Sequence, residues 1–317
     1  MRTVVTGGAG FIGSTLTDAL LAGGHDVEVI DDLSSGRLEN LEVARQTGRL
    51  GFHEIDIRDN SVVDLLVELK PEVIFHLAAQ ADVRVSVARP GFDAGINILG
   101  SINILEGARH AGARRVVAAA SGGTLYGDPP AEDIPTSETV AQSPLSPYGV
   151  SKKSMIDYLV AYQGLHGTEF MALALGNVYG PRQDPHGEAG VVAIFAEKLL
   201  RREAVTVFGT GEQTRDFVYV DDVVDAFVRA AERGQNQVVN IGTGEELSVN
   251  ELLATMMAIT DASAPPVHAD ARHGELFRSC LAVTRASTEL GWSSTTSFHD
   301  GASATLEFVR GQLGDLS

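Results

Sequence analysis

The sequence predicts an α/β protein with a doubly wound parallel sheet and a smaller, mixed C-terminal lobe. Short β-branched runs alternate with segments whose apolar residues recur at helical spacing, and this alternation is typical of parallel βαβ units. After Pro181 the pattern changes, because loops rich in Gly, Pro and Asp surround short helical stretches. We therefore predict one domain over residues 1–175, completed by a strand near 237–242, and a second lobe over 176–317.

The elements of the first domain follow from local patterns. A buried strand is predicted at residues 3–7, and the helix after it ends at Gly23 and Gly24. The remaining predicted elements are strands at 26–31, 51–57, 72–79, 114–121 and 169–180, and helices at 61–69, 98–111 and 149–165. The run "QVVNIGTG" at 237–244 is predicted to be one more strand.

Composition excludes several classes of function. The formal net charge of −18 disfavours binding to nucleic acid. No apolar run approaches the length of a membrane span, and the opening residues lack the apolar core of a signal peptide. Cys280 is the single cysteine, so we expect neither an intrachain disulfide nor a cysteine-based zinc site, and no metal. These observations predict a cytoplasmic protein without a membrane or nucleic-acid partner.

The segment "TGGAGFIG" joins the first strand to the first helix. Gly8, Gly10 and Gly13 form G-x-G-x-x-G, and Gly7 adds the overlapping G-x-x-G-x-x-G spacing. Glycines at this place allow a tight turn and close backbone approach, while the helix N-terminus favours a pyrophosphate. The alternative is a glycine turn that only packs the helix closely. The position favours a Rossmann-like dinucleotide site.

Two carboxylates end the second predicted strand. Asp31 and Asp32 begin 18 residues after Gly13. A carboxylate there can accept hydrogen bonds from both hydroxyls of the adenosine ribose and would repel a 2′-phosphate. The sequence therefore predicts NAD rather than NADP as the cofactor.

The segment "PYGVSK" carries a candidate catalytic pair. In a helix, Tyr148 and Lys152 lie on one face. With six tyrosines and four lysines in the chain, about 0.08 such pairs are expected by chance. An ammonium and the charge of a nicotinamide would lower the pKa of a phenol, which is normally near 10. Tyr148 could then accept a proton from a substrate hydroxyl while hydride leaves the same carbon, and Lys152 could also hold the nicotinamide ribose.

Together these motifs resemble the extended short-chain dehydrogenases/reductases, specifically the NAD-dependent nucleotide-sugar epimerase/dehydratase family. The resemblance spans nearly the whole chain, through "DDLSSG", "HLAAQADVRVSV", "NILGSINILEGA", "SGGTLYG", "NVYGPRQ", "TRDFVYVDDV", "NIGTG" and "RHGEL". It implies tightly held NAD, a UDP-sugar substrate and a homodimer in which helices 98–111 and 149–165 pair into a four-helix bundle.

The resemblance also assigns the cofactor-binding residues. It places Asn97 near the site as a buried helix asparagine, although a capping or core amide is an equal alternative. The other predicted contacts are Gly7, Gly10, Phe11, Ile12 and Gly13 at the pyrophosphate turn, Asp31 and Asp32 at the ribose, Asp56 and Ile57 at the adenine, Leu77, Ala78, Ala79 and Gln80 along the cofactor, and Tyr148 with Lys152.

The chain departs from the family pattern at two places. Relatives place a Ser or Thr four residues before the tyrosine of "YG", where it bonds the reacting sugar oxygen. Here that position is Gly122, so Ser121 and Thr124 are the candidate hydroxyls, with Ser121 favoured slightly. Where relatives often carry Arg-Tyr, this chain has Ala174 and Leu175, so the wall of the nicotinamide pocket is expected to differ.

The same segment predicts the reaction. Family dehydratases use Thr-Asp-Glu there, and decarboxylating relatives commonly keep a glutamate, whereas residues 122–125 contain no carboxylate. This favours epimerisation of a UDP-hexose at C4. The alternatives are a nucleotide-sugar reductase or dehydrogenase that releases NADH in each cycle, and a weakly catalytic NAD-binding scaffold.

The second lobe carries the predicted substrate contacts. Guanidinium groups suit diphosphate oxygens because of their planar fork. By resemblance the contacts are Asn177 at the diphosphate or sugar, Val207 and Phe208 at the base, Arg215 and Arg272 at the diphosphate, Glu275 at a ribose hydroxyl and Ser279 at the C2 substituent of the sugar, with Ser121 and Tyr148 at the reacting carbon.

Overall fold

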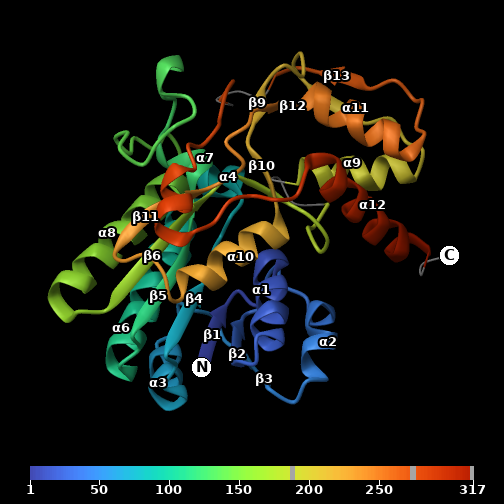
Figure 1. The fold of residues 1–317 in the computed structure, drawn as a ribbon. Coiled ribbons are helices and arrows are strands. Elements are labelled where there is room, and N and C mark those ends of the chain that lie inside the picture. Colours follow the sequence, from blue (N-terminus) through green and yellow to red (C-terminus); the bar gives the residue numbers. More distant parts are fainter. Residues whose placement is uncertain (186–189, 272–275, 315–317) are drawn as a thin grey trace.

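A seven-stranded parallel sheet forms the centre of the molecule (Figure 1). The computed structural model describes residues 1–185, 190–271 and 276–314. The strand order is β11-β6-β5-β4-β1-β2-β3, and every neighbouring pair is parallel. These strands are β1 (Arg2–Thr6), β2 (Asp26–Asp31), β3 (Leu50–Glu54), β4 (Val73–His76), β5 (Arg115–Ser121), β6 (Glu169–Leu175) and β11 (Gln237–Ile241). The predicted doubly wound α/β fold is confirmed.

Helices cover both faces of this sheet. On one face α1 (Phe11–Ala22) packs against α10 (Val220–Ala230), with α2 (Glu42–Arg45) beside α1. On the other face α6 (Ser101–Ala111) packs between α3 (Ser61–Leu69) and α8 (Pro147–His166). Each face has its own core, since Leu16 and Phe227 belong to one buried cluster and Leu66, Ile104 and Ile156 to the other. The strands read as nearly continuous apolar runs because both faces are covered.

Shorter elements connect these layers near the carboxyl ends of the strands. They are α4 (Val83–Ala88), α5 (Pro90–Ala94), the π-helix η2 (Gly95–Gly100) and α7 (Gly122–Leu125), with η1 (Leu38–Leu41), η3 (Ala131–Asp133) and η4 (Ala286–Leu290) elsewhere. In open parallel sheets, ligands bind beyond these carboxyl ends. The connections therefore surround the predicted site.

The second lobe combines three helices with short strand pairs. In Figure 1, α9 (Val191–Leu200), α11 (Val249–Thr260) and α12 (Phe298–Gly314) gather to one side of the main sheet. Three strand pairs accompany them: β7 (Asn177–Tyr179) with β10 (Phe217–Tyr219), β9 (Thr214–Arg215) with β12 (Leu247–Ser248), and β8 (Thr206–Phe208) with β13 (Val267–Ala269). Arg182 ties this part to α1, because its guanidinium lies 2.7 Å from the Asp18 carboxylate and 3.2 Å from the Ser14 hydroxyl.

Several boundaries differ from the sequence predictions. The predicted strand at 169–180 is two strands, because Gly176 bonds back to Ile241 O while Asn177 N bonds Asp216 O, which diverts the chain to β10. The helix predicted at 98–111 begins as the π-helix η2. The strands predicted at 51–57 and 72–79 end at Glu54 and His76, and the residues after them form loops at the sheet edge.

Candidate functional site

The glycine turn between β1 and α1 forms a backbone cradle. Gly7 has φ +70°, and a Cβ there would lie 2.7 Å from Ala78 N. A Cβ on Gly13 would collide with Gly7 O, so both positions require glycine. Gly10 is the N-cap of α1 and has no side chain to bond the first-turn N–H groups of Phe11 and Ile12. This cradle fits the pyrophosphate of NAD, which needs close backbone approach and a helix N-terminus.

Asp31 holds the next loop against this turn. Its carboxylate accepts hydrogen bonds from Ala9 N and Leu33 N, both at 2.9 Å. Burial raises the pKa of Asp31, and these two hydrogen bonds oppose the rise. Asp32 is exposed and binds the backbone N–H and hydroxyl of Ser34. Asp31 lies at the end of β2, where a carboxylate can meet an adenosine ribose. Its assignment to the ribose stays a prediction.

The loop after β4 lies beside the cradle, and the loop after β3 adjoins the end of β2. Asp56 pairs with Arg58, whose hydrogen bonds lower the pKa of the Asp56 carboxyl. Ile57 is buried and packs against Gly100 of η2. After β4, Leu77 N bonds Thr6 O at 3.1 Å, which starts residues 77–80 alongside the end of β1.

Asn97 clamps the segment that contains Gln80. Its Oδ1 accepts from Gln80 N at 2.9 Å, and its Nδ2 donates to Gln80 O at 2.8 Å. The same Nδ2 also donates to Asp93 at 3.0 Å. Of the two alternatives left open for Asn97, these contacts favour the core amide that orders the segment along the predicted cofactor path.

Tyr148 and Lys152 begin the long helix α8. Ser146 caps the helix by accepting from Gly149 N at 3.1 Å, and Pro147 suits its first position. The Lys152 side chain is buried, with Nζ donating to Ala119 O at 2.9 Å and lying 5.9 Å from the centroid of the Tyr148 ring. Both side chains thus reach the carboxyl end of β5, as the helical spacing predicts.

Burial dominates the acid–base properties of this pair. It raises the pKa of Tyr148 to about 12, while a hydrogen bond from Ser121 opposes the rise. It lowers the pKa of Lys152 to about 8, and the charge of Asp93 opposes that fall. Burial therefore outweighs the other influences on the phenol, and the lowered tyrosine pKa predicted from the sequence, which depends on the charge of a nicotinamide, stays a prediction.

The structure distinguishes the two candidate hydroxyls. Ser121 ends β5, and its side chain lies close enough to Tyr148 to lower the pKa of the phenol. The Oγ1 of Thr124 is buried without a hydrogen-bond partner among the described residues. A Cβ on Gly122 would lie 2.5 Å from Leu281 Cδ1, so Leu281 occupies the space of the family hydroxyl. These contacts favour Ser121 as the group that assists Tyr148.

Among the predicted substrate residues, the contacts place Asn177 beside the catalytic segment. Asn177 Oδ1 would lie 4.0 Å from a Cβ on Gly123, so this side chain faces the segment after Ser121. The Val207 side chain is in the core, whereas Phe208 is partly exposed. Arg215 donates to Thr214 O at 2.7 Å. Arg272 and Glu275 lie outside the described residues.

Asp216 binds the backbone of the segment that contains Ser279. It is buried and accepts from Thr243 N at 2.7 Å, Gly244 N at 3.2 Å and Leu281 N at 3.2 Å. Leu281 in turn lies against Gly122. By binding Leu281 N, Asp216 therefore holds the segment that contains Ser279 and Leu281 beside the catalytic segment. Sequence reasoning did not identify this role for Asp216.

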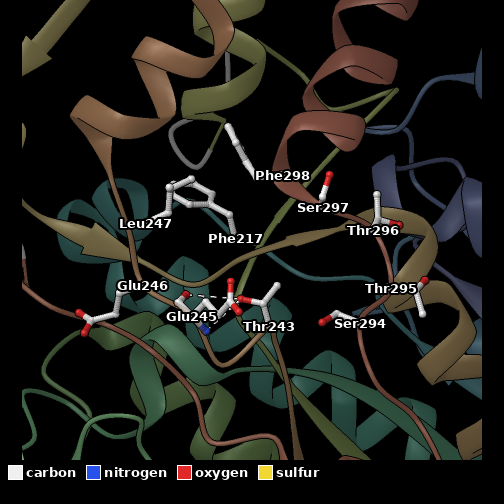
Figure 2. Close-up of a pocket in the computed structure, with 10 residues that line it drawn as sticks. All are labelled: Phe217, Thr243, Glu245, Glu246, Leu247, Ser294, Thr295, Thr296, Ser297 and Phe298. Atoms are coloured by element: carbon white, nitrogen blue, oxygen red, sulfur yellow. Dashed lines mark hydrogen bonds between the residues drawn. The ribbon is translucent and has the colours of Figure 1, made fainter.

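A pocket of about 290 Å³ lies beyond this network (Figure 2). Its lining includes Thr243, Glu245 and Glu246 after β11, and residues 294–298 before and at the start of α12. None of the predicted catalytic or cofactor residues lines it. It is therefore distinct from the site formed around Tyr148.

A buried polar network behind the site was also missed by the sequence analysis. His76 at the end of β4 bonds Thr6 Oγ1 at 2.8 Å and Ser101 Oγ at 2.9 Å. Since Ser101 donates to Asn97 O and Thr6 accepts from Ala78 N, His76 carries its proton on Nε2. Burial lowers the pKa of His76 to about 3, so it is neutral. Only the pairing across strands reveals this network.

The fold, the glycine cradle and the Tyr148–Lys152 pair define a dinucleotide-dependent enzyme of the short-chain dehydrogenase/reductase class. Residues 3–242 match the NAD dependent epimerase/dehydratase family. The chain belongs to this family, and NAD is its cofactor. This confirms the family and the cofactor predicted from the sequence.

Several known proteins are similar to this chain over nearly its full length. It is 51% identical to a UDP-glucose 4-epimerase of Mycolicibacterium smegmatis, over 98% of this chain and 99% of the relative. A UDP-glucose 4-epimerase of Thermotoga maritima solved with UDP-glucose has a TM-score of 0.95 and 44% identity, over 99% of this chain and 100% of that one. One of Thermus thermophilus, in complex with NAD, has a TM-score of 0.91 and 39% identity, over 98% and 99% of the two chains.

The described residues contain neither a candidate membrane span nor a candidate metal site. Among these residues no helix combines the length and apolar character that a membrane crossing needs. Within the same ranges no three His, Cys, Asp or Glu side chains cluster as metal ligands would.

Proposed function

We propose that this protein interconverts UDP-glucose and UDP-galactose by inverting C4 through a 4-keto sugar, with NAD held tightly. The observation that carries the proposal is the meeting of Tyr148, Lys152 and Ser121 at the end of β5, where residues 122–125 supply no carboxylate. Such a site can move one proton beside a hydride acceptor, and residues 122–125 add no second acid–base group for elimination. The identity of 51% to a UDP-glucose 4-epimerase supports the same reaction.

In the proposed reaction each of these residues has a separate role. The turn with Gly7, Gly10 and Gly13 would hold NAD, which would supply a reversible hydride acceptor for C4. Tyr148 takes the proton of the 4-hydroxyl, and Ser121 bonds the phenol and stabilises its ionised form. Lys152 contributes a buried positive charge beside that phenol. Epimerisation needs the keto sugar to turn its other face before the proton and hydride return, so the substrate lobe must hold the nucleotide while leaving the sugar free to rotate.

The test is a panel of nucleotide sugars assayed for C4 inversion without added NAD. We expect UDP-glucose and UDP-galactose to interconvert with no net NADH. A reductase or dehydrogenase would instead accumulate NADH or require an external oxidant. Inversion of neither sugar, with intact bound NAD, would contradict the proposal and favour the scaffold alternative.

We further propose that the substrate lobe, mostly residues 176–317, binds the UDP-sugar. Asn177 and Phe208 support this because both are partly exposed on strands of the lobe, and Arg215 supplies a guanidinium on β9. Arg272 and Glu275 complete the proposed contacts from outside the described residues. Arg215→Ala should then raise KM for UDP-sugars more than it lowers kcat.

Ser279 is proposed to admit a large C2 substituent on the sugar. The side chain is small, and the neighbouring Leu281 touches the catalytic segment at Gly122. We expect turnover of UDP-N-acetylglucosamine and UDP-N-acetylgalactosamine as well as the plain sugars. Ser279→Tyr should lower the N-acetyl activity about 5- to 150-fold and spare UDP-glucose, because overpacking a few atoms costs about 1–3 kcal/mol. Undiminished N-acetyl activity in the tyrosine variant would contradict the assignment.

We also propose a homodimer through α8 and the helix that η2 and α6 form. These neighbouring helices expose Leu99, Val150, Tyr158, Val160 and Leu165. Pairing two copies would remove this apolar surface from water. Sedimentation at micromolar concentration should show a dimer, and Val150→Glu should shift it toward monomer. A monomeric wild-type protein would refute the proposal.

We place the enzyme in the cytoplasm, with no nucleic-acid or membrane partner. The support is the net charge of −18 and the single, buried Cys280, which needs no oxidising compartment.

A further inference from the structure

A fully buried carboxylate lies behind the catalytic helix, and the proposed reaction assigns it no role. Asp93 on α5 is 0% exposed. Its Oδ1 accepts from Gln80 Nε2 at 3.1 Å and Asn97 Nδ2 at 3.0 Å, and its Oδ2 accepts from Ser151 Oγ. Asp93 thereby joins the segment after β4, the π-helix η2 and the second turn of α8.

The hydrogen bonds around Asp93 suit an ionised carboxylate. Asn97 Oδ1 accepts from Gln80 N, and Gln80 Oε1 accepts from Asp82 N at 2.6 Å. These bonds fix both amides so that their nitrogen atoms point at Asp93 Oδ1 as donors. With the Ser151 hydroxyl at Oδ2, three donors face the two oxygens of this buried carboxylate, an arrangement that favours its charged form.

Lys152 is the buried cation beside the residue that bonds Asp93. It follows Ser151 directly on α8, and both side chains are buried. The Lys152 ammonium bonds a neutral carbonyl, while the charge of Asp93 raises the pKa of Lys152 against the effect of burial. The same charge raises the pKa of Tyr148.

Other charged groups around Asp93 have partners of their own or are neutral. On α4, Arg84 pairs with Asp82, and after it Arg89 lies over an aromatic ring. The η2 segment contains no titratable side chain, and His76 on β4 is neutral. On α8, Lys153 pairs with an aspartate one turn away on the exposed face.

We propose that Asp93 is a positioning residue for the reaction: its carboxylate anchors α8 through Ser151, and its charge keeps Lys152 ionised beside Tyr148. The inference rests on the proposed function only in that Tyr148 and Lys152 carry the proton transfer. It concerns their protonation and placement, which can be measured without turnover.

Two variants separate charge from anchoring. Asp93→Asn keeps the shape, and its carbonyl oxygen can still face both amides while its NH₂ donates to Ser151, whose hydroxyl can accept. Only the charge is lost. Since that charge raises the pKa values of Tyr148 and Lys152, both should titrate about half a unit to one unit lower. Ser151→Ala keeps the charge and loses the anchor, so it should slow turnover about tenfold without shifting either titration.

The measurement is the ultraviolet absorbance of phenolate against pH in the NAD-loaded enzyme, with the Tyr148→Phe spectrum subtracted, beside the pH–rate profile. An acid shift in Asp93→Asn and none in Ser151→Ala supports the proposal. An unshifted titration in folded Asp93→Asn with wild-type NAD content overturns it, as does an equal shift in Ser151→Ala.

The design remains decisive if a variant or the proposed function fails. If Asp93→Asn does not fold, Asp93→Glu decides, because it retains the charge: a wild-type titration supports the proposal and an acid shift overturns it. If the wild type inverts no sugar, the proposed function fails, while the phenolate titration still tests Asp93.

Discussion

Tyr148→Phe is expected to reduce C4 inversion by about 10³- to 10⁴-fold, the upper part of the range for a positioned acid–base group. In the proposed reaction the phenol accepts the substrate proton, and phenylalanine has no atom that can replace it. The backbone N–H of residue 148 bonds Ser86 Oγ at 3.2 Å and is unaffected by the substitution, so the start of α8 should keep its place. The measurement is single-turnover conversion of UDP-galactose, because slow residual activity is then quantified against enzyme concentration.

NAD content and thermal unfolding serve as controls for this variant. Both should match the wild type, since the phenol contributes no packing that the phenyl ring lacks. Unchanged turnover in Tyr148→Phe would remove the tyrosine from the mechanism. A wild-type protein with no turnover to lose would instead support the NAD-binding scaffold.

Ser121→Ala is expected to slow turnover by about 10²-fold, as for one positioned proton-relay or oxyanion group. The hydrogen bond from Ser121 holds the pKa of Tyr148 below the value that burial alone would impose. Without it the pKa rises further, so less phenolate is present at neutral pH. The rising limb of the pH–rate profile should therefore move to higher pH, which distinguishes this effect from a general loss of structure.

Thr124→Val is the matched control, because it removes the other candidate hydroxyl at nearly constant shape. The Thr124 Oγ1 is buried and has no partner among residues the structure describes, so turnover should change little. The reverse ranking of the two variants would move the role to Thr124. Adding Gly122→Ser to Ser121→Ala should not restore activity, since Leu281 fills the space that the new side chain would need.

The sequence alone determined the features that depend on neighbouring residues. The glycine turn follows the first strand at a spacing that backbone geometry requires, and the structure shows Gly7 with φ +70° in that turn. The pairing of Tyr148 with Lys152 follows from the helical repeat, and α8 indeed contains both. Strand and helix order predicted the doubly wound sheet because apolar periodicity is local.

Only the tertiary structure decided the features that depend on residues far apart in the chain. Leu281 fills the space that a side chain at Gly122 would need, and Asp93 meets Ser151 through packing of α5 on α8. The high pKa of Tyr148 also follows from burial, which no spacing of residues reveals. Sequence patterns specify which groups can share a helix face or a turn, whereas burial and long-range contacts set what those groups do, because both arise only when the elements pack together.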